Sequence, residues 1–414
     1  MTAPIPPAEL ERYADVIVQV GLNIQPGQRL IIRADLTTAD LVRAVARRAY
    51  QAGARLIDVT WSDEQLALIR VQTAPRDSLS EAAAWIPRVS VEYMRAGDVR
   101  LAITSETPTL MVNQDPEAVS TMKRAEARAA QELFALLQRN ASVWTVVAYP
   151  SPGWAAHVFP GLPADEQVSG LWRAIATICR LHAADPVATW WAHIADLEAR
   201  SAYLTERAYS ALHFRAPGTD LRVGLAPGHS WAGGGSVSER GQRFVPNLPT
   251  EEVFTLPHRE RVEGTVRSSR PLIYGGNVID EFTLTFEGGR VVRATAAQGE
   301  EVLRRLLATD EGAARLGEVA LAPGSSPVGQ TGLLFANTLY DENASSHLAL
   351  GGGYRFCLAG GSSMSAEEFA AAGGNLSAIH EDFMIGSPAM DVDGLTATGS
   401  AEPVMRGGEW AFRV

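Results

Sequence analysis

The chain has 414 residues, of which 46% are hydrophobic and 20% charged, a balance typical of a folded globular protein with a substantial core. Its net charge of −11 disfavours nucleic acid as a partner, and no apolar stretch approaches the length of about 18 residues that a membrane span needs. Two cysteines in a chain of this length argue against a disulfide framework and for a reducing compartment.

The first half of the sequence alternates strand and helix patterns. Residues 29–34 (RLIIRA) predict a buried strand, residues 37–53 predict a helix that ends at Gly53, and residues 54–61 predict the next strand. This order predicts a parallel sheet with a right-handed crossover. Two further strands and three helical stretches are predicted, at 99–104, 142–150, 116–139, 164–182 and 186–209.

The pattern changes near residue 210, where short β-type runs separated by glycine, proline and asparagine begin. Residues 281–296 predict a hairpin with a Gly-Gly turn, and residues 299–317 predict one or two helices. We therefore expect an α/β N-terminal domain with a parallel sheet at 1–209 and an α+β C-terminal domain rich in antiparallel strands at 210–414. The weakly structured stretch at 224–250 is long enough to suggest a functional loop.

Several common catalytic motifs are missing from the sequence. It contains neither a G-x-x-x-x-G-K-[ST] phosphate loop nor a G-x-S-x-G nucleophile elbow. The run HEDFM at 380–384 begins like the zinc motif H-E-x-x-H but ends in Met384. These absences leave a concentration of potential metal ligands in the second half as the main chemical signal.

Two histidines belong to this concentration. His380 and Asp382 form an H-x-D pair, and in a strand residues i and i+2 point to the same face, so both could reach one ion. His347 lies in ENASSHLALGGGY (342–354), where small residues and Gly351–Gly353 permit close backbone approach. Each signal is weak alone, because one exposed strand face gives the same H-x-D spacing and a single histidine is more often not a ligand.

Carboxylates complete the set. Glu318 stands between a glycine and a β-type apolar run, which is an unusual place for a solvated charge. Glu251 and Glu252 follow Thr250 and fit the first turn of a helix equally well. Together, two histidines and about three carboxylates suit two adjacent divalent ions.

Long segments of the sequence resemble a known family. The runs at 247–272, 299–321, 341–361 and 371–387, with 13–32 and 49–63 in the first half, resemble the aminopeptidase T and aminopeptidase S family of metallo-aminopeptidases, also called the thermophilic metalloprotease family. The resemblance runs over the full length. It implies cytoplasmic homodimers with an N-terminal α/β domain and a C-terminal catalytic domain that releases the N-terminal residue of peptides.

The resemblance also implies site residues. A dinuclear metal site corresponds to Glu252, Glu318, His347, His380 and Asp382, with Glu318 bridging the ions, and the family pattern favours Glu252 over Glu251 as the inward carboxylate. The expected ions are two zinc ions per chain, with cobalt or manganese as alternatives, and they would activate a bridging water. Glu318 or Glu251 would take the proton of this water, and Tyr354 would donate a hydrogen bond to the oxyanion.

Two other functions compete with this interpretation. His347, His380 and Asp382 would also form the facial triad of a mononuclear Fe(II) ring-cleaving dioxygenase, but such a site has no need of Glu252 and Glu318. A closed structural zinc site in a non-enzymatic scaffold would usually include several thiolates, and only Cys357 lies near the cluster in sequence.

Overall fold

The computed structural model describes residues 5–275 and 277–414. The chain forms two compact units. The first contains the residues up to Ala192 together with Gly235–Pro249, and the second contains His193–Gly234 and Thr250–Val414. The division lies within helix α9 (Pro186–Arg207), whereas the predicted boundary at 209 and 210 follows the end of this helix. The domain limits themselves stay a prediction.

A five-stranded parallel sheet forms the centre of the first unit, with the strand order β10-β4-β3-β1-β2. The predicted strands are present, and the β-α-β order gives the parallel sheet that we predicted. The strands are β1 (Arg29–Asp35), β2 (Leu56–Ser62), β3 (Val99–Thr104), β4 (Trp144–Ala148) and β10 (Asn247–Leu248).

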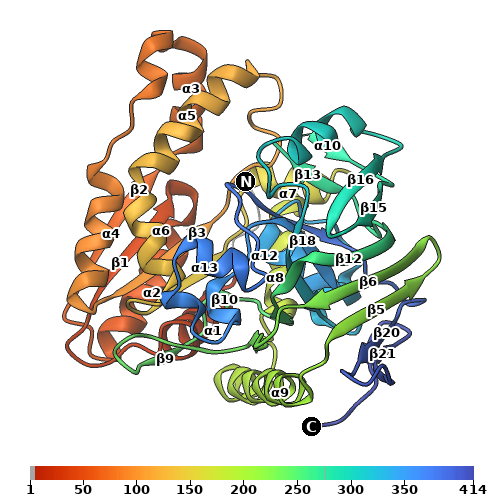
Figure 1. Ribbon diagram of the computed structural model, residues 1–414. Helices are drawn as coiled ribbons and strands as arrows, with labels where there is room; N and C mark the ends of the chain where they lie inside the picture. Colours follow the sequence, from red (N-terminus) through yellow and green to blue (C-terminus); the bar gives the residue numbers. More distant parts are fainter. Residues whose placement is uncertain (1–4, 276) are drawn as a thin grey trace. The chain divides into compact units, whose positions relative to one another are not determined.

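Amphipathic helices pack against this sheet. Helix α4 contacts β1, β3 and α6 (Figure 1). Val91 and Met94 of α4 form a buried cluster with Leu133 and Leu136 of α6. The α-helices of this unit are α1 (Pro7–Val16), α2 (Ala39–Gln51), α3 (Glu64–Thr73), α4 (Trp85–Ala96), α5 (Pro116–Ala129), α6 (Gln131–Gln138), α7 (Pro152–Val158) and α8 (Ala164–Ile178).

The weakly structured stretch predicted at 224–250 contains short strands, and part of it belongs to the first unit. Strands β7 (Ala232–Gly233), β8 (Ser236–Val237) and β9 (Arg243–Phe244) precede β10. The backbone of Val245 donates a hydrogen bond to Gly21, and Val146 donates one to Pro246. These bonds add β10 to the edge of the parallel sheet.

The second unit contains two large antiparallel sheets and a short antiparallel pair, β13 (Leu272–Tyr274) with β14 (Asn277–Ile279). The eight-stranded sheet has the order β16-β15-β12-β6-β5-β20-β21-β22, and the five-stranded sheet has the order β19-β18-β17-β11-β7. The first is built from β5 (Ala211–Ala216), β6 (Thr219–Leu225), β12 (Pro257–Arg267), β15 (Thr283–Glu287), β16 (Arg290–Thr295), β20 (Asp391–Leu395), β21 (Ala401–Arg406) and β22 (Glu409–Trp410). The second adds β11 (Val253–Thr255), β17 (Leu316–Leu321), β18 (His347–Gly351) and β19 (His380–Met384) to β7.

One apolar core joins the two sheets. Phe214 and Val223 of the larger sheet belong to the same buried cluster as Val319, Leu348 and Phe383 of the smaller one. The predicted hairpin is present as β15 and β16 with Gly288 and Gly289 in the turn. The stretch 299–317 gives one helix, α10 (Glu300–Leu307), and its last two residues already belong to β17. The fold class predicted for the C-terminal half is therefore confirmed.

A β-bulge interrupts the pairing of β17 with β18. Leu316 pairs with Leu350 and Glu318 pairs with Ala349, so Gly317 is an extra residue on β17. A Cβ atom on Gly317 would lie 2.3 Å from the carbonyl oxygen of Gly351. Only glycine fits there, because the contacting atom belongs to the backbone and cannot rotate away.

We predict that Gly317→Ala destabilises the protein by about 3 kcal/mol, since one added methyl group must push two strands apart. The free energy of unfolding from urea denaturation measures this change. Gly161→Ala is the matched control, because a Cβ at Gly161 would meet nothing within 4 Å. Equal stability of the two variants would show that the strands can separate at no cost.

Candidate active site

The register of the five-stranded sheet brings four of the predicted ligands to one face. Directly paired residues on antiparallel strands share a face, and so do residues two apart on one strand. His347 of β18 pairs with Ala320, which is two residues from Glu318 on β17. Two residues beyond His347, Ala349 pairs with Asp382 of β19, and Gly351 pairs with His380.

Glu252, the residue directly before β11, lies on the same face. Phe254 of β11 pairs with Ala320, and Glu252 precedes Phe254 by two residues, so the two side chains share a face. Glu251 has the opposite orientation, because its Oε2 lies 3.3 Å from Nε2 of His193 on α9. Of the two adjacent glutamates, Glu252 is therefore the one that faces the other predicted ligands. The helical first turn considered for this segment is not formed, since β11 begins at Val253.

The imidazole nitrogens and carboxylate oxygens of the five side chains lie close to one another. Nε2 of His347 lies 3.0 Å from Oε2 of Glu252 and 3.5 Å from Oε1 of Glu318. Nε2 of His380 lies 3.5 Å from Oε2 of Glu318 and 3.5 Å from Oδ1 of Asp382. The donor atoms thus form two groups, Glu252, Glu318 and His347 in one and Glu318, His380 and Asp382 in the other, and Glu318 belongs to both.

Both histidines are oriented by backbone carbonyl groups. Nδ1 of His380 donates to the carbonyl oxygen of Gly352 at 2.7 Å, and Nδ1 of His347 lies 3.3 Å from that of Ser345. Because Nδ1 carries the proton that the carbonyl accepts, Nε2, which points at the carboxylates, is the atom that would bind a metal ion. Histidine ligands of metal ions are commonly held in this way. The glycine run near His347 therefore has a second role, since Gly352 supplies the carbonyl that orients His380.

Two carboxylate oxygens fit a metal better than a hydrogen-bond network. In the part of the chain that the structure describes, Oε2 of Glu252 and Oδ1 of Asp382 are buried and receive no hydrogen bond of good geometry, although Nε2 of His347 and of His380 lie 3.0 and 3.5 Å away. Buried polar atoms normally have a partner, because desolvation without one costs about 1–3 kcal/mol. A divalent ion accepts lone pairs from oxygen and imidazole nitrogen together, so the donor set and the unpaired atoms both fit a metal site.

The field at this face is strongly negative. Burial raises the pKa of Glu318 to about 7, with contributions from Asp382 and Glu252. Burial alone would lower the pKa of His380, but the nearby Asp382 and Glu318 raise it to about 10. Burial likewise opposes a charge on His347, yet Glu252 raises its pKa well above the ordinary value. Such a field attracts cations.

Tyr354 lies beside this cluster. Its ring centroid is 4.9 Å from that of His380. Burial, and then the charges of Glu318 and Asp382, raise the pKa of the Tyr354 hydroxyl well above its ordinary value. The hydroxyl therefore keeps its proton and can donate a hydrogen bond beside the carboxylates.

Sequence reasoning missed one acidic residue, Glu342. Burial raises the pKa of Glu342 well above its ordinary value, and Glu252 and Asp382 raise it further by charge repulsion. It opens the short 3₁₀ helix at Glu342–Ala344. The only signal for Glu342 in the sequence is its place five residues before the candidate ligand His347, a spacing that does not by itself indicate a shared site.

Two buried asparagines hold the segments that carry the site. The amide oxygen of Asn343 accepts a hydrogen bond from the backbone of Glu251 at 2.6 Å, which fixes the segment leading to Glu252. The amide nitrogen of Asn375 donates to the carbonyl oxygens of Gly312 and Gly351 at 2.8 and 2.7 Å. These bonds tie β18 to the segments that precede β17 and β19.

An antiparallel sheet that brings two histidines and three carboxylates together on one face has the composition of a metal-binding site. A comparison with protein families identifies the class of protein: the chain belongs to the thermophilic metalloprotease family (M29), whose model matches residues 7–410.

Relatives cover nearly the whole chain. It is 47% identical over 401 residues to aminopeptidase T of Thermus thermophilus, covering 97% of this chain and 98% of that protein. It is 43% identical over 404 residues to aminopeptidase AmpS of Bacillus subtilis, covering 98% of each. The solved structure of wild-type AmpT from Thermus thermophilus matches with a TM-score of 0.93 at 46% identity, covering 98% of this chain and 99% of that one. The fold is thus that of a solved relative.

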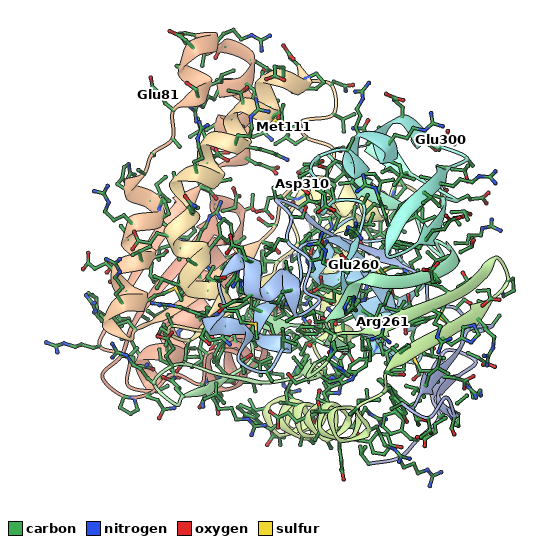
Figure 2. All side chains as sticks on the ribbon, viewed as in Figure 1. Glu81, Met111, Glu260, Arg261, Glu300 and Asp310 are labelled. Carbon is green, nitrogen blue, oxygen red and sulfur yellow. The ribbon has the colours of Figure 1, made fainter. Side chains whose placement is uncertain are left out.

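Asp310, labelled in Figure 2, fixes the approach to β19. It accepts hydrogen bonds from the backbone of Ala378 at 2.7 Å, the hydroxyl of Ser377 at 2.8 Å and the backbone of Ala313 at 2.9 Å. Burial favours the neutral acid, but these bonds hold the pKa of Asp310 below its ordinary value. The ionised carboxylate therefore stabilises the fold.

We predict that Asp310→Asn lowers the free energy of unfolding by about 2 kcal/mol at pH 7, because hydrogen bonds to a charged acceptor are lost. A depressed pKa contributes stability above the unfolded value of about 3.9, so the difference from wild type should shrink as the pH falls below about 4. Urea denaturation at both pH values measures it, with Asp165→Asn, at an exposed position of α8, as control. A difference that grows toward low pH would contradict the assignment.

Proposed function

We propose that the chain is a metal-dependent aminopeptidase that hydrolyses the peptide bond after the N-terminal residue of peptides. The observation that carries this proposal is the pair of donor groups that share Glu318. Family membership and relatives named aminopeptidase T and aminopeptidase AmpS support it. The mononuclear dioxygenase considered from the sequence has no support in these comparisons, because the matching family consists of proteases.

The finer assignments belong to the same proposal. Glu252, Glu318, His347, His380 and Asp382 would hold two divalent ions, with Glu318 between them. Zinc suits the mixture of imidazole and carboxylate ligands, and cobalt and manganese suit it as well. We further propose a cytoplasmic homodimer. Both cysteines are free and buried, which fits a reducing compartment. Among the described residues, the structure contains no helix that is long and apolar enough to span a membrane.

When bound, two divalent ions supply Lewis acidity toward the scissile carbonyl and a water that ionises near neutral pH. The protein's own groups would do the rest. Glu318 lies within 3.5 Å of both histidines and is placed to accept the proton of the attacking water. Glu251 was the other candidate for this role, and its contact with His193 on the far side of the segment argues against it.

Tyr354 and Glu342 would act on the substrate. The protonated hydroxyl of Tyr354 would donate a hydrogen bond to the carbonyl oxygen as negative charge develops on it. Glu342 adds an acidic side chain near the cluster, and in its ionised form this side chain would attract the α-ammonium group of a free N-terminus. Recognition of this group would restrict the enzyme to the end of a peptide chain.

The first test combines metal content with activity. We expect about two divalent ions per chain, loss of leucyl-p-nitroanilide hydrolysis after chelation, and recovery with zinc, cobalt or manganese. Glu318→Gln should lower both metal content and activity, the latter more than about a hundredfold, because even partners of ligands contribute about 10–100-fold.

Glu260→Gln is the matched control for this test, since Glu260 of β12, labelled in Figure 2, is exposed. One iron per chain without hydrolysis would contradict the proposal. Full metal content and activity in Glu318→Gln would contradict the shared role of that residue.

We predict that Tyr354→Phe lowers kcat about a hundredfold and leaves KM nearly unchanged, because the hydroxyl acts on charge that develops only in the transition state. Steady-state kinetics on leucyl-p-nitroanilide give both constants, and metal analysis confirms that the site is loaded. Tyr50→Phe, which removes a hydroxyl from a 51% exposed side chain at the end of α2, serves as control. An unchanged kcat in Tyr354→Phe would remove the tyrosine from the reaction.

A further inference from the structure

An aromatic surface begins at the candidate metal site and continues to the protein surface. Its first member after His380 is Tyr354, with ring centroids 4.9 Å apart. Phe356 stacks on Tyr354 with a centroid distance of 5.2 Å and an interplanar angle of 26°. Phe254 of β11 lies 5.7 Å from Tyr354 and 6.1 Å from Phe356. Each of the three rings therefore contacts the other two, and we call them the aromatic wall.

Two of the rings are anchored in the interior. Phe254 and Tyr354 pack against a small buried cluster that includes Leu256, Cys357 and Phe369. Phe254 also shares its strand with the segment of Glu252, two residues away, so its position is tied to the candidate ligands. The wall is thus built on the same framework as the metal site.

Phe356 has a different environment. It lies in the 3₁₀ turn Arg355–Cys357, where Cys357 is buried and Phe356 is 40% exposed. Isolated exposed apolar residues are common and need no explanation. This one is not isolated, because it extends a continuous aromatic surface from the cluster of carboxylates and histidines to solvent. An apolar surface beside a polar site is the usual composition of a ligand pocket.

We propose that Phe254, Tyr354 and Phe356 form one side of a subsite for the side chain of the substrate's N-terminal residue, and that this subsite favours large apolar residues such as leucine and phenylalanine. The inference rests on the proposed aminopeptidase function. It adds a substrate class and assigns Phe356 as a specificity-determining residue.

The chemistry of the substrate leads to this choice of residue. The side chain of the N-terminal residue branches from the carbon that bears the α-amine and the scissile carbonyl. The carbonyl must lie near Tyr354 and the candidate ligands to react. A surface that starts at His380 and Tyr354 is therefore within reach of that side chain. Aromatic rings provide apolar contact area with little loss of side-chain entropy.

The test measures selectivity with a series of aminoacyl-p-nitroanilides. For Phe356→Ala in the metal-loaded full-length protein, we expect kcat/KM to fall about tenfold or more with leucyl and phenylalanyl substrates and less than about threefold with alanyl. Phe356→Leu should restore most of the leucyl activity. Phe134→Ala is the matched control, since Phe134 of α6 is 54% exposed in the other unit.

Different outcomes separate this inference from the function on which it rests. No hydrolysis of any aminoacyl substrate by the wild-type protein would refute the proposed function. Wild-type hydrolysis with equal losses for leucyl and alanyl substrates in Phe356→Ala, at full metal content, would overturn the subsite alone. So would a larger loss for arginyl than for leucyl substrates, because the favoured class would then be cationic.

A second series places the subsite on one side of the scissile bond. Dipeptides with leucine first and glycine, leucine or phenylalanine second keep the N-terminal residue constant. We expect Phe356→Ala to lower kcat/KM by a similar factor for all three. A loss confined to those with a large second residue would overturn the assignment to the N-terminal residue. Phe254→Leu, which keeps an apolar side chain on β11, is measured in both series as a second variant of the aromatic wall.

Discussion

Three acidic side chains lie close together at one face of a sheet, with Glu342 of the 3₁₀ helix Glu342–Ala344 electrostatically coupled to them, and their mutual repulsion must be balanced by positive charge. Removing an ionised carboxylate from water costs several kcal/mol unless it is paired. The imidazoles that contact these acidic groups in the described structure are those of His347 and His380. The uncompensated repulsion raises the pKa values of Glu318 and Glu342, in addition to the effect of burial. A pair of divalent ions would balance this charge, so the proposed function and the stability of the site depend on the same electrostatic requirement.

The sheet can carry this charged cluster because its two faces differ in composition: one bears the candidate ligands and the other bears apolar side chains. The face opposite the ligands places Val319, Leu348 and Phe383 in the core shared with the eight-stranded sheet. A slip of one residue in any strand would exchange the faces and bury charge in that core. The alternation of polar and apolar residues therefore fixes the register, and the bulge at Gly317 adjusts it where β17 passes the glycines that follow β18.

Local sequence patterns predicted much of the sheet structure and part of the candidate site. The H-x-D spacing of His380 and Asp382 indicated a strand face, and β19 has that form, while β3 was placed correctly by its short apolar run. The attachment of residues 235–249 to the first unit was not predictable, because it depends on hydrogen bonds to Gly21 and Val146, distant in sequence. The family resemblance favoured Glu252 over Glu251, but the physical reason for that choice required the register of β11. Glu342 has no periodic pattern that would reveal it.

Under the two proposals, strand β11 and the residue before it would link metal binding to substrate choice. Glu252 and Phe254 occupy one face two residues apart, about 7 Å along a strand, so a shift that moved one would move the other. Phe356 is not tied to this strand, because it lies in the turn Arg355–Cys357 and is 40% exposed. If the aromatic wall binds the substrate's side chain, selectivity can therefore change at Phe356 without disturbing the ligands. Changes at Phe254 would alter selectivity and metal geometry together.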